Sequence, residues 1–273
     1  MRAILAERIR QACGYRFPRV GLRAFRAVLS ALPPEVETEL FPGIHMTLNL
    51  RDSTQAATYW QGERFESPTS QIFTRWVGQG GAMFFDIGSN YGFFSYCLLS
   101  KFPELGVNAF EPNPKTFALV QSIKERNHLD RMRVWNMGLG DQEARLTLHP
   151  GETDSGHSTF GQHPELTAAL GEIQVLPFDV WRARQNLPLP AQPRWIAKID
   201  VEGFELNVLR GMTEALSARA FLGLSVEINE NTLKFCGASG EEIFALLNQH
   251  GYRLMDRQVG AGAPIENAFF VPA

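Results

Sequence analysis

The sequence predicts an α/β protein in which helices cover both faces of a mostly parallel β-sheet. From residue 83 onward, apolar runs of strand length alternate with amphipathic segments of helix length. Three of these apolar runs end at an acidic residue followed by a turn, namely Asp86, Glu111 and Asp200. Open α/β sheets bind ligands at the carboxyl ends of their strands, so these carboxylates are expected near one site.

The composition is that of a soluble globular protein. A length of 273 residues suits one large α/β domain with an extension, and 44% of the residues are hydrophobic and 20% charged. Cys13, Cys97 and Cys236 are far apart and form no C-x-x-C pair. We therefore expect a cytoplasmic protein with no disulfide framework, no zinc site and no transmembrane segment.

Residues 1–40 are predicted to form a basic, amphipathic helical extension, and residues 41–273 the main domain. Residues 1–32 contain seven arginines and one acidic residue, so the remainder of the chain is acidic and no nucleic-acid groove is expected there. The extension lacks the continuous apolar centre of a signal peptide. It could pack on its own domain or on a second copy, or dock on an acidic carrier protein or an anionic membrane.

The elements follow from local patterns. Pro33 and Pro34 end the basic segment, and residues 44–50 alternate as in a half-buried strand. A helix over 69–77 follows, and Glu66 just before it could cap that helix or approach a ligand, with capping the favoured role. The later helices are predicted over 93–102, 112–127, 204–218 and 239–250, with another beginning within 175–179. The later strands are predicted at 132–136, 145–148, 195–199, 222–228, 252–255 and 268–271, the last two antiparallel.

The turn Asp86-Ile87-Gly88-Ser89-Asn90-Tyr91-Gly92 is the first candidate for ligand binding. Its glycines let the backbone turn sharply and let a ligand lie against it. A dinucleotide site would need G-x-G-x-x-G, which is absent here and which disfavours a nicotinamide-dependent oxidoreductase. A carboxylate and an asparagine instead suit a cationic ligand with an amino-acid portion, such as S-adenosylmethionine (SAM). The alternative is an ordinary tight turn with a capping aspartate.

Further cofactor contacts are expected on the neighbouring strands. Glu111 can accept hydrogen bonds from both ribose hydroxyls, and the turn from Asn136 to Asp141 lies where adenine is expected. The predicted cofactor-binding residues are Asp86, Gly88, Ser89, Asn90, Gly92, Glu111, Pro112, Asn136, Gly138, Asp141 and Asp200.

Lys198 stands in a strand that should be buried on both sides, so its ammonium needs an anionic partner. Glu227 is the predicted partner if the two strands are adjacent, and a structural and a catalytic role remain equally open. His149, His157 and His163 lie near the polar segment 152–162, which could be a lid or an acceptor-binding loop. Their spacing predicts no metal site.

These motifs together resemble the FkbM family of SAM-dependent methyltransferases. The resemblance rests on Asp86-x-Gly88-x-Asn90-x-Gly92, on residues 109–114 (AFEPNP) and on residues 198–205 (KIDVEGFE), and it runs from about Phe41 to the C-terminus. It implies a Rossmann-like class I methyltransferase fold with seven mostly parallel strands and an antiparallel last strand. It also implies O-methylation of a sugar or polyketide hydroxyl, with N-methylation of a peptide side-chain amide or a catalytically silent SAM-binding protein as alternatives.

A hydroxyl acceptor must lose its proton when it is methylated. Asp200, at a strand end that would face the methyl group, is the first candidate for orienting or deprotonating the acceptor, with Glu202 and His157 as further candidates. Asp86 and Asn90 are expected to hold the methionine end of SAM. The identity of the acceptor is not predicted.

Overall fold

A computed structural model describes residues 33–150, 158–161, 168–259 and 265–273 of the chain. The predicted helix of residues 1–32 therefore lies outside the described residues, as do His157 and His163.

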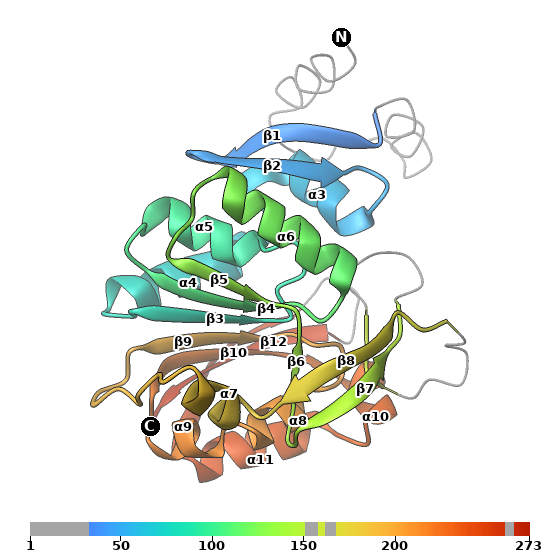
Figure 1. The fold of residues 1–273 in the computed structure, drawn as a ribbon. Helices are drawn as coiled ribbons and strands as arrows, with labels where there is room; N and C mark the ends of the chain where they lie inside the picture. The colour runs from blue at the N-terminus through green and yellow to red at the C-terminus, as the bar shows by residue number, and fades with distance from the viewer. Residues whose placement is uncertain (1–32, 151–157, 162–167, 260–264) are drawn as a thin grey trace.

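The core of the fold is a seven-stranded sheet with the order β11-β12-β10-β9-β3-β4-β5 (Figure 1). Neighbouring strands from β10 to β5 are parallel, whereas β12 is antiparallel to both β10 and β11. This architecture confirms the predicted Rossmann-like α/β fold. The strands are β3 (Met83–Ile87), β4 (Gly106–Phe110), β5 (Met132–Trp135), β9 (Trp195–Ile199), β10 (Phe221–Asn229), β11 (Tyr252–Val259) and β12 (Ile265–Pro272).

Helices cover both faces of this sheet (Figure 1). Successive strand residues point to opposite faces, so Phe84 belongs to one apolar core and Phe85 to the other. The first core contains α4 (Ser67–Gly78), α5 (Phe93–Lys101) and α6 (Pro114–Arg126). The second contains α7 (Phe178–Arg184), α8 (Glu205–Arg210), α9 (Thr213–Ser217) and α11 (Gly240–Gln249).

The segment before the sheet differs from its prediction. Residues 35–40 were predicted to belong to a helical extension, but they lie in β1 (Glu35–Phe41), which forms an antiparallel hairpin with β2 (Ile44–Asn49). The alternation of exposed and buried side chains along β1 explains the strand. Helix α3 (Ser53–Gln61), capped by Asp52, and the short η1 (Gly62–Arg64) follow and were not predicted.

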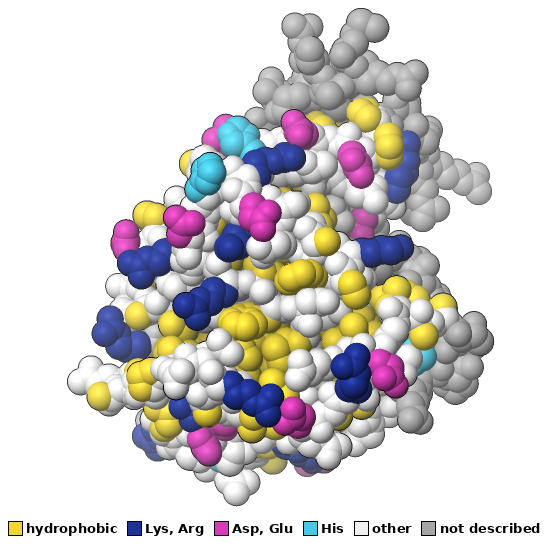
Figure 2. Space-filling view, in the orientation of Figure 1, with side chains coloured by type: hydrophobic (Ala, Val, Ile, Leu, Met, Phe, Trp, Pro, Cys, Tyr) yellow, Lys and Arg dark blue, Asp and Glu magenta, His cyan; other side chains and the backbone are white. Residues whose placement is uncertain are grey.

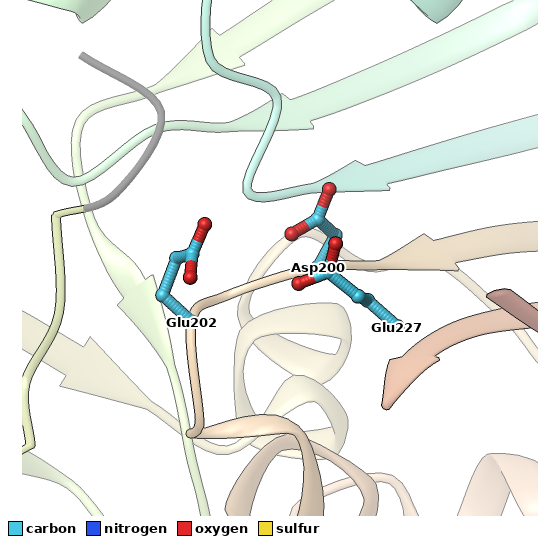
Figure 3. A group of neighbouring side chains, drawn as sticks. All are labelled: Asp200, Glu202 and Glu227. Atoms are coloured by element: carbon cyan, nitrogen blue, oxygen red, sulfur yellow. The ribbon is translucent and has the colours of Figure 1, made fainter. Parts of the chain in front are cut away.

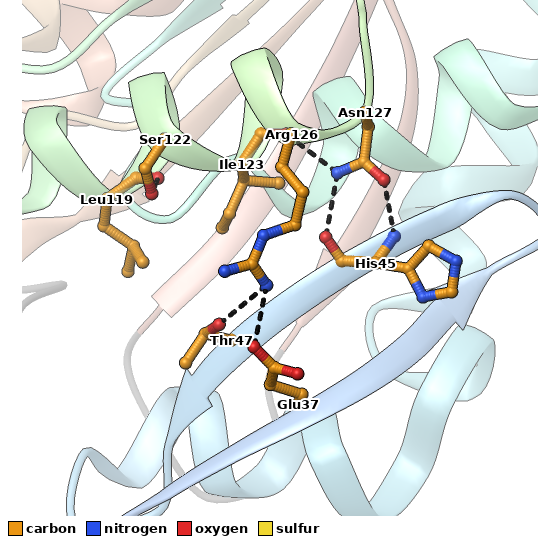
Figure 4. A network of polar contacts seen from close by, with 8 residues as sticks. All are labelled: Glu37, His45, Thr47, Leu119, Ser122, Ile123, Arg126 and Asn127. Atoms are coloured by element: carbon orange, nitrogen blue, oxygen red, sulfur yellow. Dashed lines mark hydrogen bonds and ion pairs between the residues drawn. The ribbon is translucent and has the colours of Figure 1, made fainter.

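Helix α6 holds this hairpin through polar contacts (Figure 4). The Asn127 side chain donates to the backbone oxygen of His45 and accepts from its amide, both at 2.8 Å. The guanidinium of Arg126 lies 3.2 Å from the Glu37 carboxylate and donates to Thr47 Oγ1. These contacts tie segments about eighty residues apart to each other.

Three further differences concern residues beyond β5. A small second sheet contains β6 (Gly138–Leu139), β8 (Gly171–Leu176) and β7 (Ala144–Leu148), of which only β7 was predicted. The helix predicted over 204–218 is two helices, α8 and α9, and Gly211 between them packs against the Gly140 carbonyl. Helix α10 (Glu230–Phe235) was missed, whereas the predicted cap of α11 by Ser239 is confirmed.

Basic and acidic side chains are interspersed over the face that Figure 2 shows. In the described part of the chain, no helix has the length and apolar character that crossing a membrane requires.

Candidate active site

The turn after β3 packs directly on the turn after β9. Gly88 has a φ of 75°, and a Cβ on it would lie 1.8 Å from the carbonyl oxygen of Asp200. The amide of Asp200 donates to the oxygen of Ile87 at 3.1 Å. A glycine is therefore required at position 88, because the two strand ends leave no room for a side chain.

Glu111 joins the same turn to the end of β4. Its two carboxylate oxygens accept from the amides of Asn90 and Asn113, each at 2.8 Å. Burial raises the pKa of Glu111 to about 7, although these amides favour the charged form. Each oxygen retains a lone pair, so Glu111 can still accept a hydrogen bond from a ligand.

Lys198 is the centre of a buried ion cluster. Its ammonium lies 3.0 Å from Asp200 Oδ2 and 4.0 Å from Asp86 Oδ1, and it donates to the Gly88 oxygen at 3.0 Å. Burial lowers the pKa of Lys198, but the two aspartates outweigh it and the net pKa is raised. The predicted pairing with Glu227 is therefore wrong: β9 and β10 are adjacent, but the nearer aspartates take the ammonium.

Asp86 lies beneath the turn and is only 1% exposed. Its Oδ2 accepts from Ser95 Oγ at 2.6 Å, and burial raises its pKa to about 6. It is not among the residues that line the two cavities described below. Among the described residues, the Asp86 carboxylate contacts the Ser95 hydroxyl and the Lys198 ammonium.

The first cavity, of about 40 Å³, lies between the ends of β3, β4 and β9. It includes the predicted residues Gly88, Asn90, Glu111, Pro112, Gly138 and Asp200, together with Met137, Leu139 and Phe160. In this lining the Phe160 ring packs closely on Gly138, since a Cβ at that glycine would lie 2.8 Å from the ring.

Two residues predicted to contact adenine lie outside this lining. Asp141 is exposed, whereas Asn136 donates to the backbone oxygens of Glu111 and Pro112 and so holds their segment in place. Gly92 begins α5 with a φ of 84°, and it also lies outside the residues that line either cavity.

The second cavity, of about 290 Å³, adjoins the first and shares Gly88, Asn90, Asp200 and Glu202 with it. One part of its lining is aromatic and another is acidic. The aromatic residues are Phe65, Tyr91, Phe93 and Phe94, and the acidic ones are Glu66, Asp200, Glu202 and Glu227.

Glu66 was predicted to cap α4, but its side chain makes no capping hydrogen bond. Glu66 adopts a left-handed backbone conformation with a φ of 50°, and it lines the second cavity. Burial, and then the charge of Asp200, raises its pKa. No periodic pattern in the sequence predicts this placement, which depends on how α4 packs against the sheet.

Three carboxylates come together at the ends of β9 and β10 (Figure 3). Single oxygens of Asp200, Glu202 and Glu227 lie within 4.8 Å of one another. A cation could be accommodated at that spacing, and the cation that the structure places against Asp200 is the Lys198 ammonium. Glu205 supports the loop between them, because its Oε1 accepts from the amides of Val201 and Gly203.

The chain is similar in sequence to known methyltransferases. The "Methyltransferase FkbM domain" model matches residues 86–254, from the carboxylate that ends β3 to strand β11. "Methyltransferase 1" of Beauveria bassiana is 33% identical over 146 residues, which cover 47% of this chain and 57% of that protein. "Hexuronic acid methyltransferase AglP" of Haloferax volcanii is 31% identical over 137 residues, covering 50% and 52%.

"31-O-demethyl-FK506 methyltransferase FkbM" of Streptomyces tacrolimicus is 29% identical over 206 residues, covering 65% of this chain and 75% of that one. The chain thus spans about half the length of the first two of these relatives. A putative rRNA-methylase structure from Clostridium thermocellum has a TM-score of 0.45 at 10% identity and covers 76% of this chain and 94% of that one. The model of the FkbM domain matches residues 86–254, which is more than half of the sequence. The chain therefore belongs to the methyltransferase FkbM family.

Proposed function

We propose that this protein is a SAM-dependent methyltransferase that acts on a hydroxyl of a sugar or polyketide-type natural product. The observation that carries the proposal is the pair of adjoining cavities that share Gly88, Asn90 and Asp200. One is lined by a glycine turn and a carboxylate suited to ribose, and the other by aromatic and acidic side chains. The names of two relatives, which refer to a hexuronic acid and to an O-demethyl compound, support this acceptor class.

The donor set around the first cavity suits SAM, and Phe160 would have to move aside for it, because the cavity of about 40 Å³ is smaller than that ligand. Glu111 would accept from the ribose hydroxyls, the backbone at Gly88 and Asn90 would hold the methionine end, and Met137 and Leu139 would face adenine. Bound SAM supplies a methyl group attached to a positively charged sulfur. The carboxylates around Asp200 favour that charge electrostatically.

The second cavity would take the acceptor. Phe65, Phe93 and Phe94 would exclude water from the reacting oxygen, and Asp200 would orient the acceptor hydroxyl. Positioning of two reactants in this way can contribute up to ~7–11 kcal/mol to catalysis.

Calorimetry with SAM and with NAD tests the cofactor, and SAM alone is expected to bind. A panel of glycosylated, polyketide and peptide acceptors, followed by mass spectrometry, tests the reaction. A gain of one methyl group on a sugar or polyketide oxygen is expected. Methylation of a peptide amide alone, or no methylation with intact SAM binding, would contradict the proposed acceptor class.

A further inference from the structure

Glu227 is an acidic side chain of the second cavity to which the proposed function assigns no role. It lies near the carboxyl end of β10 and lines the cavity beside Asn267 of β12. Figure 3 shows its carboxylate beside that of Asp200. Among the residues that the structure describes, none forms a hydrogen bond or ion pair with this carboxylate.

Two of the other acidic side chains of the cavity, Asp200 and Glu66, already have partners. Asp200 is ion-paired with Lys198, whose ammonium lies 3.0 Å from Asp200 Oδ2. Glu66 is hydrogen-bonded to Thr69, and a carboxylate oxygen of Glu202 lies within 4.8 Å of those of Asp200 and Glu227. Both oxygens of Glu227 therefore remain available to accept a proton from a molecule in the cavity.

Its surroundings also make Glu227 more basic than an ordinary glutamate. Burial raises its pKa well above 4.5, and the charges of Asp200, Glu202 and Glu205 raise it further, whereas Lys198 lowers it. A general base is most effective when its pKa is close to the working pH. The positive charge that bound SAM brings would favour the ionised form.

We propose that Glu227 is the catalytic base that removes the proton from the acceptor hydroxyl. The inference rests on the proposed function and assigns the proton transfer to Glu227, with Asp200 kept as the group that orients the acceptor. The acceptor oxygen gains the methyl carbon and loses its proton to the Glu227 carboxylate, while the carbon–sulfur electron pair stays on the departing thioether. Neutral Glu227 then returns the proton to solvent.

The test uses the full chain with an acceptor that the panel has identified. Glu227→Gln keeps the size of the side chain and removes the base, and Glu241→Gln, at an exposed position on α11, is its matched control. We expect E227Q to lose about 10²–10⁴-fold in single-turnover rate. Its affinity for S-adenosylhomocysteine by calorimetry and its melting temperature should match those of the wild type.

The pH profile separates a base from a structural role. Wild-type turnover should rise with pH as Glu227 ionises. E227D should turn over more slowly and show the rise at a different pH, and the turnover of E227Q should not rise. If E227Q turns over at the wild-type rate, or if its turnover rises with pH as that of the wild type does, this inference alone is overturned. A wild-type protein that methylates no hydroxylated acceptor would overturn the proposed function, and the inference with it.

Discussion

Two polar networks each join distant segments of this chain, and they differ in burial. The Lys198 cluster joins the ends of β3 and β9 with a lysine side chain only 9% exposed, whereas the Arg126 contacts join α6 to the hairpin with an arginine 47% exposed and a glutamate 76% exposed. Removing one charge from a buried network leaves another without a partner, whereas water replaces a lost surface partner. Ion pairs of similar length are therefore expected to contribute differently to stability at the site and at the hairpin.

The largest effect is expected from Lys198→Met, which retains an apolar stem but leaves Asp86 and Asp200 without their cation. We expect the free energy of unfolding to fall by about 3 kcal/mol or more, measured in urea. The exposed Lys115→Met is the control and should change little. A loss below about 1 kcal/mol in K198M would show that the cluster behaves like a surface pair.

Two glycines, one at the site and one in the hairpin, have nearly the same φ but differ in the space around them. Gly88 has a φ of 75° and a backbone oxygen 1.8 Å from its missing Cβ, whereas Gly43, in the hairpin turn, has a φ of 76° and nothing within 4 Å. Gly43→Ala should cost about 1–2 kcal/mol from φ alone. Gly88→Ala should cost more and also abolish calorimetric binding of S-adenosylhomocysteine. Equal losses, with binding retained, would contradict the close packing of the two strand ends.

The pH dependence of stability should report the buried carboxylates. Burial raises the pKa of Glu111 from 4.5 to about 7, so the folded state holds a proton that the unfolded state has already released. Its contribution to stability is present below the unfolded pKa and is lost as pH rises through the folded pKa. Urea midpoints should therefore fall between about pH 5 and pH 8. Glu111→Gln should flatten that decrease, and an unchanged slope would rule out Glu111 as its source.

The smallest effects are expected at the hairpin. Arg126→Ala should cost less than about 1 kcal/mol, because its partners are exposed. Asn127→Ala removes two hydrogen bonds to the His45 backbone and should cost about 1–2 kcal/mol. Both variants should bind S-adenosylhomocysteine as the wild type does. Reduced binding in either would show that the hairpin and the site are coupled.

Much of the site could be predicted because it lies in continuous motifs. The segments around Asp86, Glu111 and Asp200 each combine a buried strand with a turn, so the pattern indicated both the fold and the edge where a ligand would bind. Lys198 was recognised as a buried charge from its strand alone. Its partner was not, because strand adjacency does not say which of several carboxylates approaches the ammonium.

The alternating strands and helices, the acidic strand ends and the glycine-rich turn follow from the sequence pattern, since local sterics and burial dictate them. Only the tertiary structure decided that Glu66, Phe65 and Glu227 share a cavity with Asp200. Phe65 and Glu66 stand next to each other just before α4, whereas Asp200 and Glu227 lie much later in the chain, at the ends of β9 and β10. Their meeting depends on how α4 and β10 pack against the sheet, which local pattern does not encode.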